Sequence, residues 1–133
     1  MKITSVSVVP LSDPVPADRR HRNDMGTKVK SDSAIIFVDT DTGLRGMGAA
    51  MTSPSVVKAI VEDELGPDIV GMDPMYSERI YETLFNGSRT TPALAMGWSQ
   101  PVAERRSGVY MEAIAGIDIA IWDVKAQAMG LPV

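Results

Sequence analysis

The residues best suited to chemistry in this sequence are cations gathered in one polar stretch. Residues 15–32 contain five of the chain's thirteen Lys and Arg residues, together with its only histidine. These side chains are Arg19, Arg20, His21, Arg22, Lys28 and Lys30. Only three carboxylates offset them there, although the whole chain carries a net charge of −4. Such a segment is either a solvated loop or a mobile lid that attracts an anionic ligand.

Metal ligands and nucleophiles are scarce in this sequence. It contains no cysteine, which excludes disulfides, thiolate metal sites and a cysteine nucleophile. His21 has no second histidine and no nearby glutamate to complete a ligand set, so we expect it to be exposed to solvent. Asp118 and Asp123 are five residues apart and would point about 140° away from each other on a helix. They cannot bind one ion, and we interpret Asp118 as a partly buried hydrogen-bonding or ion-pairing residue.

The composition is that of a single folded domain. With 133 residues, of which 44% are hydrophobic and 23% charged, the chain is long enough to bury a core and too apolar to be disordered. No apolar run reaches the roughly 18 residues of a membrane helix, and the N-terminal residues predict a strand rather than a signal peptide. The net negative charge argues against nucleic-acid binding. We expect a cytoplasmic protein without membrane or nucleic-acid partners.

The first third of the chain predicts three strands. Alternating apolar residues indicate a strand over Lys2–Leu11 and a stronger one over Ser33–Asp41. A glycine-rich strand over Arg45–Met51 follows the short Asp-Thr-Gly turn, so the last two strands should form a hairpin. Between the first two strands, Ser12–Asp32 is predicted to be a long structureless loop, which inside a domain usually serves as a lid.

Helical signals follow the strands. A helix over Ser55–Leu65 should begin at Pro54 and stop at Gly66-Pro67, with a short helical turn over residues 68–71. Another should open at Asp73-Pro74 and end at Asn86-Gly87, and Ala93–Trp98 is ambiguous but could be helical. Strands followed by helices predict an α+β fold, in which a three-stranded antiparallel sheet packs on a bundle of three to four helices.

The final stretch, Gly108–Val133, is the strongest helical pattern in the chain. Its isoleucines and valine recur every three to four residues, and Gly130 before Pro132 ends the helix. A second stripe of small residues, Ala113, Gly116 and Ala120, would let another element approach closely. Trp122 is expected in a core or an interface, and Asp123 at solvent or against another domain. Gly46 and Gly48 in the third strand likewise leave room for close backbone contact or a bulge.

The run from Ala113 to Val133, AIAGIDIAIWDVKAQAMGLPV, resembles the end of the N-terminal domain in the mandelate racemase/muconate lactonizing enzyme branch of the enolase superfamily. The opening MKI, the hairpin TDTGLRGMG, the helix after SPS and the DPM before the next helix support this resemblance. It covers essentially the whole chain. One departure is Ala49, where family members often carry a glutamate, so the contribution of that glutamate to the site wall is missing.

The resemblance implies that residues 1–133 form a capping domain, with the sheet in 1–53 and the helices in 54–133. In the family the cap closes over a (β/α) barrel that carries the catalytic base and the Mg²⁺ ligands. The small-residue stripe of the last helix is then a candidate contact to that barrel. We therefore expect no catalytic residue, metal ligand or cofactor in this chain, and a barrel, absent here, as its partner. An anionic small molecule is the expected substrate, and a homo-oligomer is compatible with the family.

By this resemblance two lid loops select the substrate, residues 15–32 and about 49–53. The side chains expected to enclose it are Arg20, His21, Arg22, Lys30 and Met51. The basic first lid suggests a polar, hydroxylated anion and so favours an acid-sugar dehydratase over a racemase, epimerase or lactonizing enzyme.

A second interpretation comes from a different class of function. The chain alone would then be a non-catalytic fragment or truncated product that self-associates through its exposed apolar surface. In either case the 133 residues by themselves are expected to lack dehydratase or racemase activity.

Overall fold

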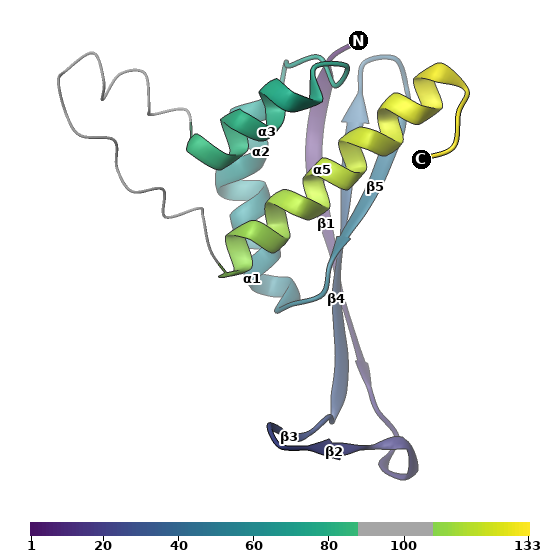
Figure 1. Cartoon of the computed structure of the whole chain (residues 1–133), viewed down its shortest axis with the longest axis vertical. Helices are drawn as coiled ribbons and strands as arrows, with labels where there is room; N and C mark the ends of the chain where they lie inside the picture. The colour runs from purple at the N-terminus through teal and green to yellow at the C-terminus, as the bar shows by residue number, and fades with distance from the viewer. Residues whose placement is uncertain (88–107) are drawn as a thin grey trace, which may run out of the picture.

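The computed structural model describes residues 1–87 and 108–133. Its main sheet has three antiparallel strands in the order β1-β4-β5, formed by Ile3–Pro14, Lys30–Thr40 and Arg45–Ala50 (Figure 1). Helices pack on this sheet, so the predicted α+β fold is confirmed. The short helix predicted at Ala93–Trp98 lies outside the described residues.

The segment predicted to be a structureless loop is largely folded. β1 and β4 continue beyond the helical part as a paired arm, with Pro14 opposite Lys30, and Val15 N donates to Val29 O at 2.9 Å. The tip contains a 3₁₀ turn, η1 (Ala17–Arg19), and a small hairpin of β2 (Arg22–Asn23) and β3 (Gly26–Thr27). Figure 1 shows this arm projecting away from both termini. Main-chain pairing needs no apolar side chains, which is why hydrophobic periodicity missed it.

The first helical stretch does not stop at Gly66-Pro67, as the sequence predicts. α1 (Pro54–Ala59) runs through a π-helical segment, η2 (Ile60–Leu65), into α2 (Gly66–Ile69). Gly66 N donates to the carbonyl oxygen of Val61, five residues back. The wider turn places Pro67 in the first turn of α2, where its missing N–H costs no hydrogen bond.

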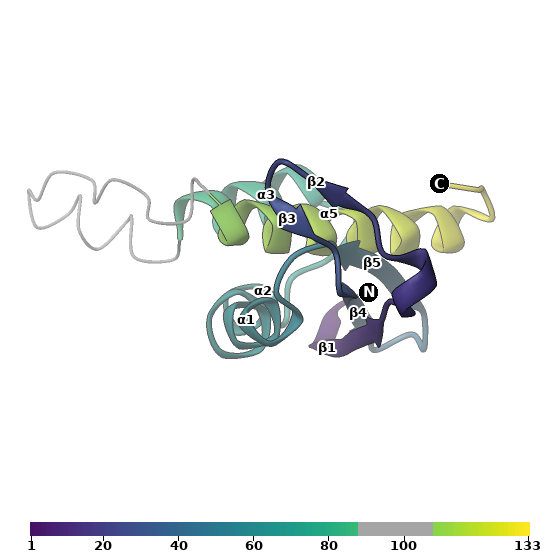
Figure 2. The ribbon, with the colours of Figure 1, turned by 90° about the horizontal axis from the view of Figure 1, so that it is seen from below.

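The remaining helices are α3 (Ser77–Asn86) and α5 (Gly108–Met129). α5 ends as predicted, because Gly130 adopts a φ of 67° and Leu131 N donates back to Ala126 O at 2.9 Å. Figure 2 shows α1 and α2 lying to one side of β1, while α5 runs across β5.

The core lies between α5 and one face of the sheet. A Cβ added at Gly48 would collide with the carbonyl oxygen of Gly116 and lie 3.1 Å from Ala120 N. One added at Gly46 would collide with Ala120 O and lie 2.7 Å from Val124 Cγ2. The small-residue stripe of α5 therefore packs on the glycines of β5 within this chain, and the expectation that it faces a missing barrel is wrong. The four small residues allow helix and strand backbones to touch.

The opposite face of the sheet carries no helix of the described chain. We call it the open sheet face, and it consists of Ser5, Ser7, Val9, Leu11, Ser33, Ile35, Phe37, Asp39, Arg45, Met47 and Ala49. A register irregularity between Ile3 and Ser5 turns Ile3 into the core on the same side as Val8. From Ser5 onward the side chains of β1 alternate regularly between the two faces of the sheet. The residues of the open sheet face are therefore those paired across the three strands with Ser5, Ser7, Val9 and Leu11.

Candidate functional site

The tip of the arm holds three of the predicted substrate-binding residues. Arg20, His21 and Arg22 are all exposed there. Arg20 Nε donates to the carbonyl oxygen of Val15 at 3.0 Å, so this guanidinium helps to fold the tip. His21 contributes its carbonyl oxygen to Lys28 N at 3.1 Å, which extends the β2–β3 hairpin and leaves the imidazole in solvent, as predicted.

The base of the arm holds the other two predicted residues. Lys30 Nζ lies 2.8 Å from Asp32 Oδ2, and Ser12 Oγ donates to Asp32 Oδ1 at 2.6 Å. The hydrogen bond from Lys30, followed by that from Ser12, lowers the pKa of Asp32. Met51 directly follows β5, is exposed, and accepts a hydrogen bond from Ser33 Oγ on its sulfur at 3.4 Å. Lys30 is therefore already paired, while Met51 offers an apolar surface beside the arm.

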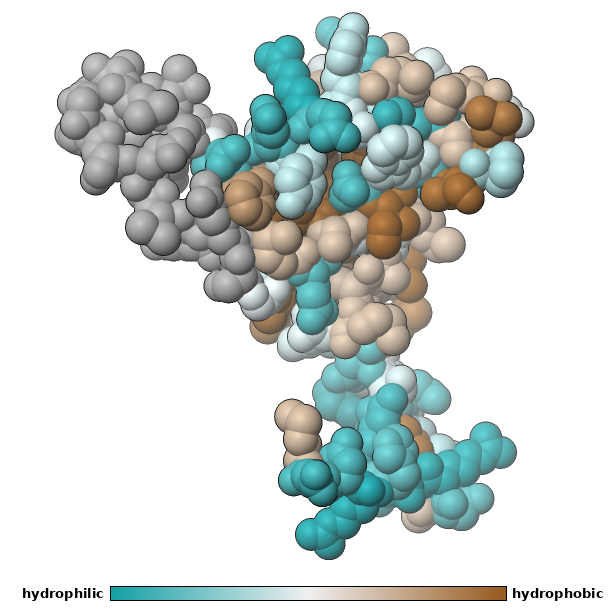
Figure 3. All heavy atoms as spheres, viewed as in Figure 1, coloured by the Kyte–Doolittle hydropathy of each residue, from teal (hydrophilic) through white to brown (hydrophobic). Residues whose placement is uncertain are grey.

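The five predicted residues are distributed along the arm rather than gathered around one centre. Figure 3 shows the arm as an almost continuously hydrophilic surface below the mixed surface of the helical part. Cationic groups sit at its tip, an ion pair and a methionine at its base.

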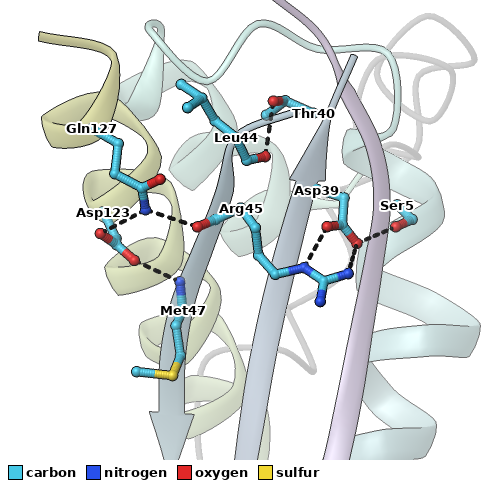
Figure 4. Close-up of polar contacts among 8 residues, drawn as sticks. All are labelled: Ser5, Asp39, Thr40, Leu44, Arg45, Met47, Asp123 and Gln127. Atoms are coloured by element: carbon cyan, nitrogen blue, oxygen red, sulfur yellow. Dashed lines mark hydrogen bonds and ion pairs between the residues drawn. The ribbon is translucent and has the colours of Figure 1, made fainter. Parts of the chain in front are cut away.

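Sequence reasoning missed a polar cluster on the open sheet face. Arg45 Nε donates to Asp39 Oδ1 at 2.6 Å, and Ser5 Oγ donates to Asp39 Oδ2 at 2.9 Å (Figure 4). The pKa of Asp39 is lowered, mainly by the Arg45 hydrogen bond and to a smaller extent by Ser5. The guanidinium also lies 5.2 Å from the centre of the Phe37 ring. The Asp-Thr-Gly turn could have revealed this pair, because it sets Asp39 opposite Arg45.

Asp123 is partly exposed, which fits the expected position at solvent, and its carboxylate is also hydrogen-bonded within the chain. Its Oδ2 accepts a hydrogen bond from Met47 N at 2.9 Å, and its Oδ1 accepts one from Gln127 Nε2 at 3.0 Å (Figure 4). Gln127 Nε2 also donates to Arg45 O at 2.7 Å. Two side chains of α5 thus satisfy main-chain groups on the outer edge of β5, which would otherwise be open to pairing.

Asp118 is partly buried, as predicted, but none of the described hydrogen bonds or ion pairs reaches its carboxylate. Burial is the main cause that raises the pKa of Asp118, Glu78 adds to it, and Lys125 opposes it. Trp122 is 44% exposed, so its placement in the core is wrong, whereas an interface stays a prediction. Lys125 Nζ lies 4.0 Å from the centre of the Trp122 ring and donates to the buried Ser77 Oγ at 2.8 Å.

Two classes of feature were searched for in the described residues. In residues 1–87 and 108–133, no three His, Asp or Glu side chains come together in a way that could hold a metal ion. Within the same ranges, no helix combines the length and apolar character needed to cross a bilayer.

Comparison with known proteins places this geometry in a family. Residues 5–133 match the model of the mandelate racemase/muconate lactonizing enzyme N-terminal domain. D-mannonate dehydratase of Novosphingobium aromaticivorans is 35% identical over 98 residues, which cover 71% of this chain and 21% of that enzyme. D-galactonate dehydratase of Verminephrobacter eiseniae is 32% identical over 98 residues, covering 72% of this chain and 22% of that enzyme.

A solved structure agrees with these matches. A mandelate racemase/muconate lactonizing enzyme homologue of Roseovarius nubinhibens ISM, complexed with magnesium, superposes with a TM-score of 0.71 at 29% identity. The superposition covers 99% of this chain and 32% of that one. The chain thus spans about a fifth of the two curated dehydratases and a third of the solved relative. It belongs to the family of mandelate racemase/muconate lactonizing enzyme N-terminal domains, the capping domains of the enolase superfamily.

Proposed function

We propose that this chain is the substrate-specificity cap of a Mg²⁺-dependent enolase-superfamily enzyme that dehydrates an acid sugar. Its family membership supports the cap, and the D-mannonate and D-galactonate dehydratases among its relatives support the reaction. Racemisation, epimerisation and lactonisation are the other reactions considered. The cationic arm favours a polar anion over an apolar acid, because long-range attraction concentrates anions near such a segment.

In this reaction a base removes the proton α to the substrate carboxylate, and an acid helps the β-hydroxyl to leave as water. The described residues of this chain do not fit a magnesium site, because no three potential ligands lie together. The base and the metal ligands would therefore belong to a (β/α) barrel, the partner proposed for this cap.

The observation that carries the proposal is the folded, cationic arm. Its strand pairing continues past Pro14 and Lys30, so the tip is held at a defined distance from the core. Arg20 stabilises the turn with one of its N–H groups, donated to Val15, and it stays exposed together with His21 and Arg22. These three side chains are able to donate hydrogen bonds to a carboxylate or hydroxyl. We infer that Lys30 acts mainly by shaping the arm, because Asp32 holds its charge.

A chimera would test the proposal. Residues 1–133 would replace the corresponding cap of the D-mannonate dehydratase, and release of 2-keto-3-deoxy acids would be measured with Mg²⁺ over a panel of acid sugars. We expect turnover of at least one, and a KM raised about tenfold or more when Arg22 is replaced by Ala, corresponding to about 1.4 kcal/mol of lost binding. Arg79→Ala on α3 is the matched control and should leave KM unchanged.

Two outcomes would count against the proposal. A folded chimera that binds Mg²⁺ but dehydrates none of the acids would contradict the reaction. An active chimera whose KM is insensitive to Arg22→Ala would contradict the role of the arm in recognition.

A further inference from the structure

Each outer strand of the main sheet is hydrogen-bonded on its outward side by a pair of helix side chains. In the order β1-β4-β5, the strands β1 and β5 are the edges, so the main-chain groups on their outward sides point away from the other strands. Figure 2 shows α1 beside β1, and α5 running across β5. Each of these two helical stretches supplies two side chains, four residues apart, to the adjacent edge.

At the β1 edge the pair is Lys58 and Glu62. Val8 N donates to Glu62 Oε1 at 2.8 Å, and Lys58 Nζ donates to Val8 O at 3.2 Å. Lys58 Nζ also donates to Glu62 Oε1 at 2.7 Å, which links the two side chains to each other. The pair therefore exchanges both main-chain hydrogen bonds with one residue, as the opposite residue of an antiparallel strand would.

At the β5 edge the pair is Asp123 and Gln127. Gln127 Nε2 is bonded to Asp123 Oδ1, and the two side chains satisfy the N–H of Met47 and the C=O of Arg45 (Figure 4). Residues two apart in a strand present their main-chain groups to the same side, so Arg45 and Met47 both face outward. Each edge thus carries a carboxylate and a nitrogen donor in the place of a further strand.

Three more positions on the outward side of β1 are closed in other ways. Ile3 exchanges two main-chain hydrogen bonds with residues 71–72, at 2.9 and 2.8 Å. Counting in twos along the strand from Val8 reaches Pro10 and Pro14, which have no N–H to donate. Proline at such positions is a common way to keep an edge strand from pairing. The closed edge therefore continues towards the arm, of which β1 forms one side.

Free strand edges are templates for pairing with strands of other molecules. We propose that Lys58–Glu62 and Asp123–Gln127 are edge clamps, which hold the sheet at three strands by occupying the groups through which β1 and β5 would pair with a further strand. A strand added to β1 would also run along the arm. The inference does not depend on the proposed function, because none of the predicted substrate-binding residues belongs to a clamp.

Opening one clamp and opening both should give different assemblies. Lys58→Ala/Glu62→Ala frees the β1 edge, and Asp123→Ala/Gln127→Ala frees the β5 edge. Each double variant should form a strand-paired dimer, because two molecules that join at their single open edges leave no open edge behind. The quadruple variant should grow into long assemblies that bind thioflavin T, because each molecule then has two open edges. The parent chain should bind no thioflavin T.

Amide hydrogen exchange measured by NMR identifies the pairing directly. In the parent chain the amides of Val8 and Met47 should be protected at every concentration. In the matching double variant the freed amide should exchange about tenfold faster or more at about 50 µM, and it should regain protection at about 1 mM, where pairing between molecules replaces the clamp.

A control separates edge pairing from a general loss of stability. Leu84→Ala removes a fully buried side chain of α3 and leaves both clamps in place, so it should destabilise the domain without producing thioflavin T binding. A quadruple variant that is folded by circular dichroism but binds no thioflavin T overturns the inference, and so do equal assemblies of Leu84→Ala. If the quadruple variant is unfolded, the two double variants decide: freed amides that stay unprotected at high concentration overturn the inference.

Discussion

Replacing Gly48 by alanine should force α5 away from the sheet. Glycine-to-alanine changes within a strand normally stabilise a protein, by roughly 0.5–1 kcal/mol, because the unfolded chain loses freedom. Here the new Cβ would collide with Gly116 O and lie 2.9 Å from the carbonyl carbon of the same residue. These atoms belong to the helix backbone, so no side-chain rotation can relieve the clash.

The magnitude follows from the displacement required. α5 would have to retreat by roughly 1 Å, and a gap of that size forfeits a quarter to a half of the dispersion energy in the contacts it opens. The buried residues on this side include Ile117 and Ile121. We expect a loss of about 3 kcal/mol in the free energy of unfolding, the upper end for overpacked cores. A domain with about 5–15 kcal/mol of stability would remain folded but clearly weakened.

Urea denaturation followed by circular dichroism would measure this loss. Gly43→Ala is the matched control, because its added Cβ meets nothing within 4 Å while its φ of 82° disfavours alanine. It should cost about 1 kcal/mol from backbone conformation alone. The close-approach argument is refuted if Gly48→Ala is as stable as the parent chain, or if it costs no more than Gly43→Ala.

Three further predictions concern polar groups. Asp123→Ala should cost about 1–2 kcal/mol in urea denaturation, because it removes the acceptor of a β5 main-chain N–H, and an unchanged midpoint would contradict that role. Hydrogen bonds from Lys58 and then from Val8 N lower the pKa of Glu62 below its ordinary 4.5, so its stabilisation is present above that value and lost as the pH falls through the folded-state pKa. Glu62→Gln should flatten this loss of stability in acid, and an unaltered pH profile would be the contrary result. The pKa of Asp118 is raised, so its charged form destabilises the fold, and Asp118→Asn should raise the urea midpoint at pH 7. This gain should disappear once the pH is well below the ordinary value of 3.8, and an equal gain at both pH values would contradict it.

The sequence by itself determined the elements whose signals are local. Alternation in β4 and the Asp-Thr-Gly turn predicted the β4–β5 hairpin, because pleat and turn chemistry act within a few residues. The repeat in α5 and Gly130 after it predicted that helix and its end. The exposed positions of the predicted substrate-binding residues also follow from their polar surroundings in sequence.

Only the tertiary structure shows which segments those elements pack against. The polar arm is paired because the β1–β4 hydrogen bonding that starts in the core continues as far as Pro14 and Lys30. Main-chain hydrogen bonds do not require apolar side chains, so the sequence shows no hydrophobic periodicity there. The small-residue stripe of α5 shows that something approaches closely, but only the fold shows that β5 does so. Likewise, only the fold shows that Asp123 accepts a hydrogen bond from Met47 N at the edge of β5, 76 residues away in the sequence. Local propensity acts within one turn or one strand. Close packing of two backbones, and hydrogen bonding to the free edge of a strand, depend instead on which segment, distant in sequence, packs there.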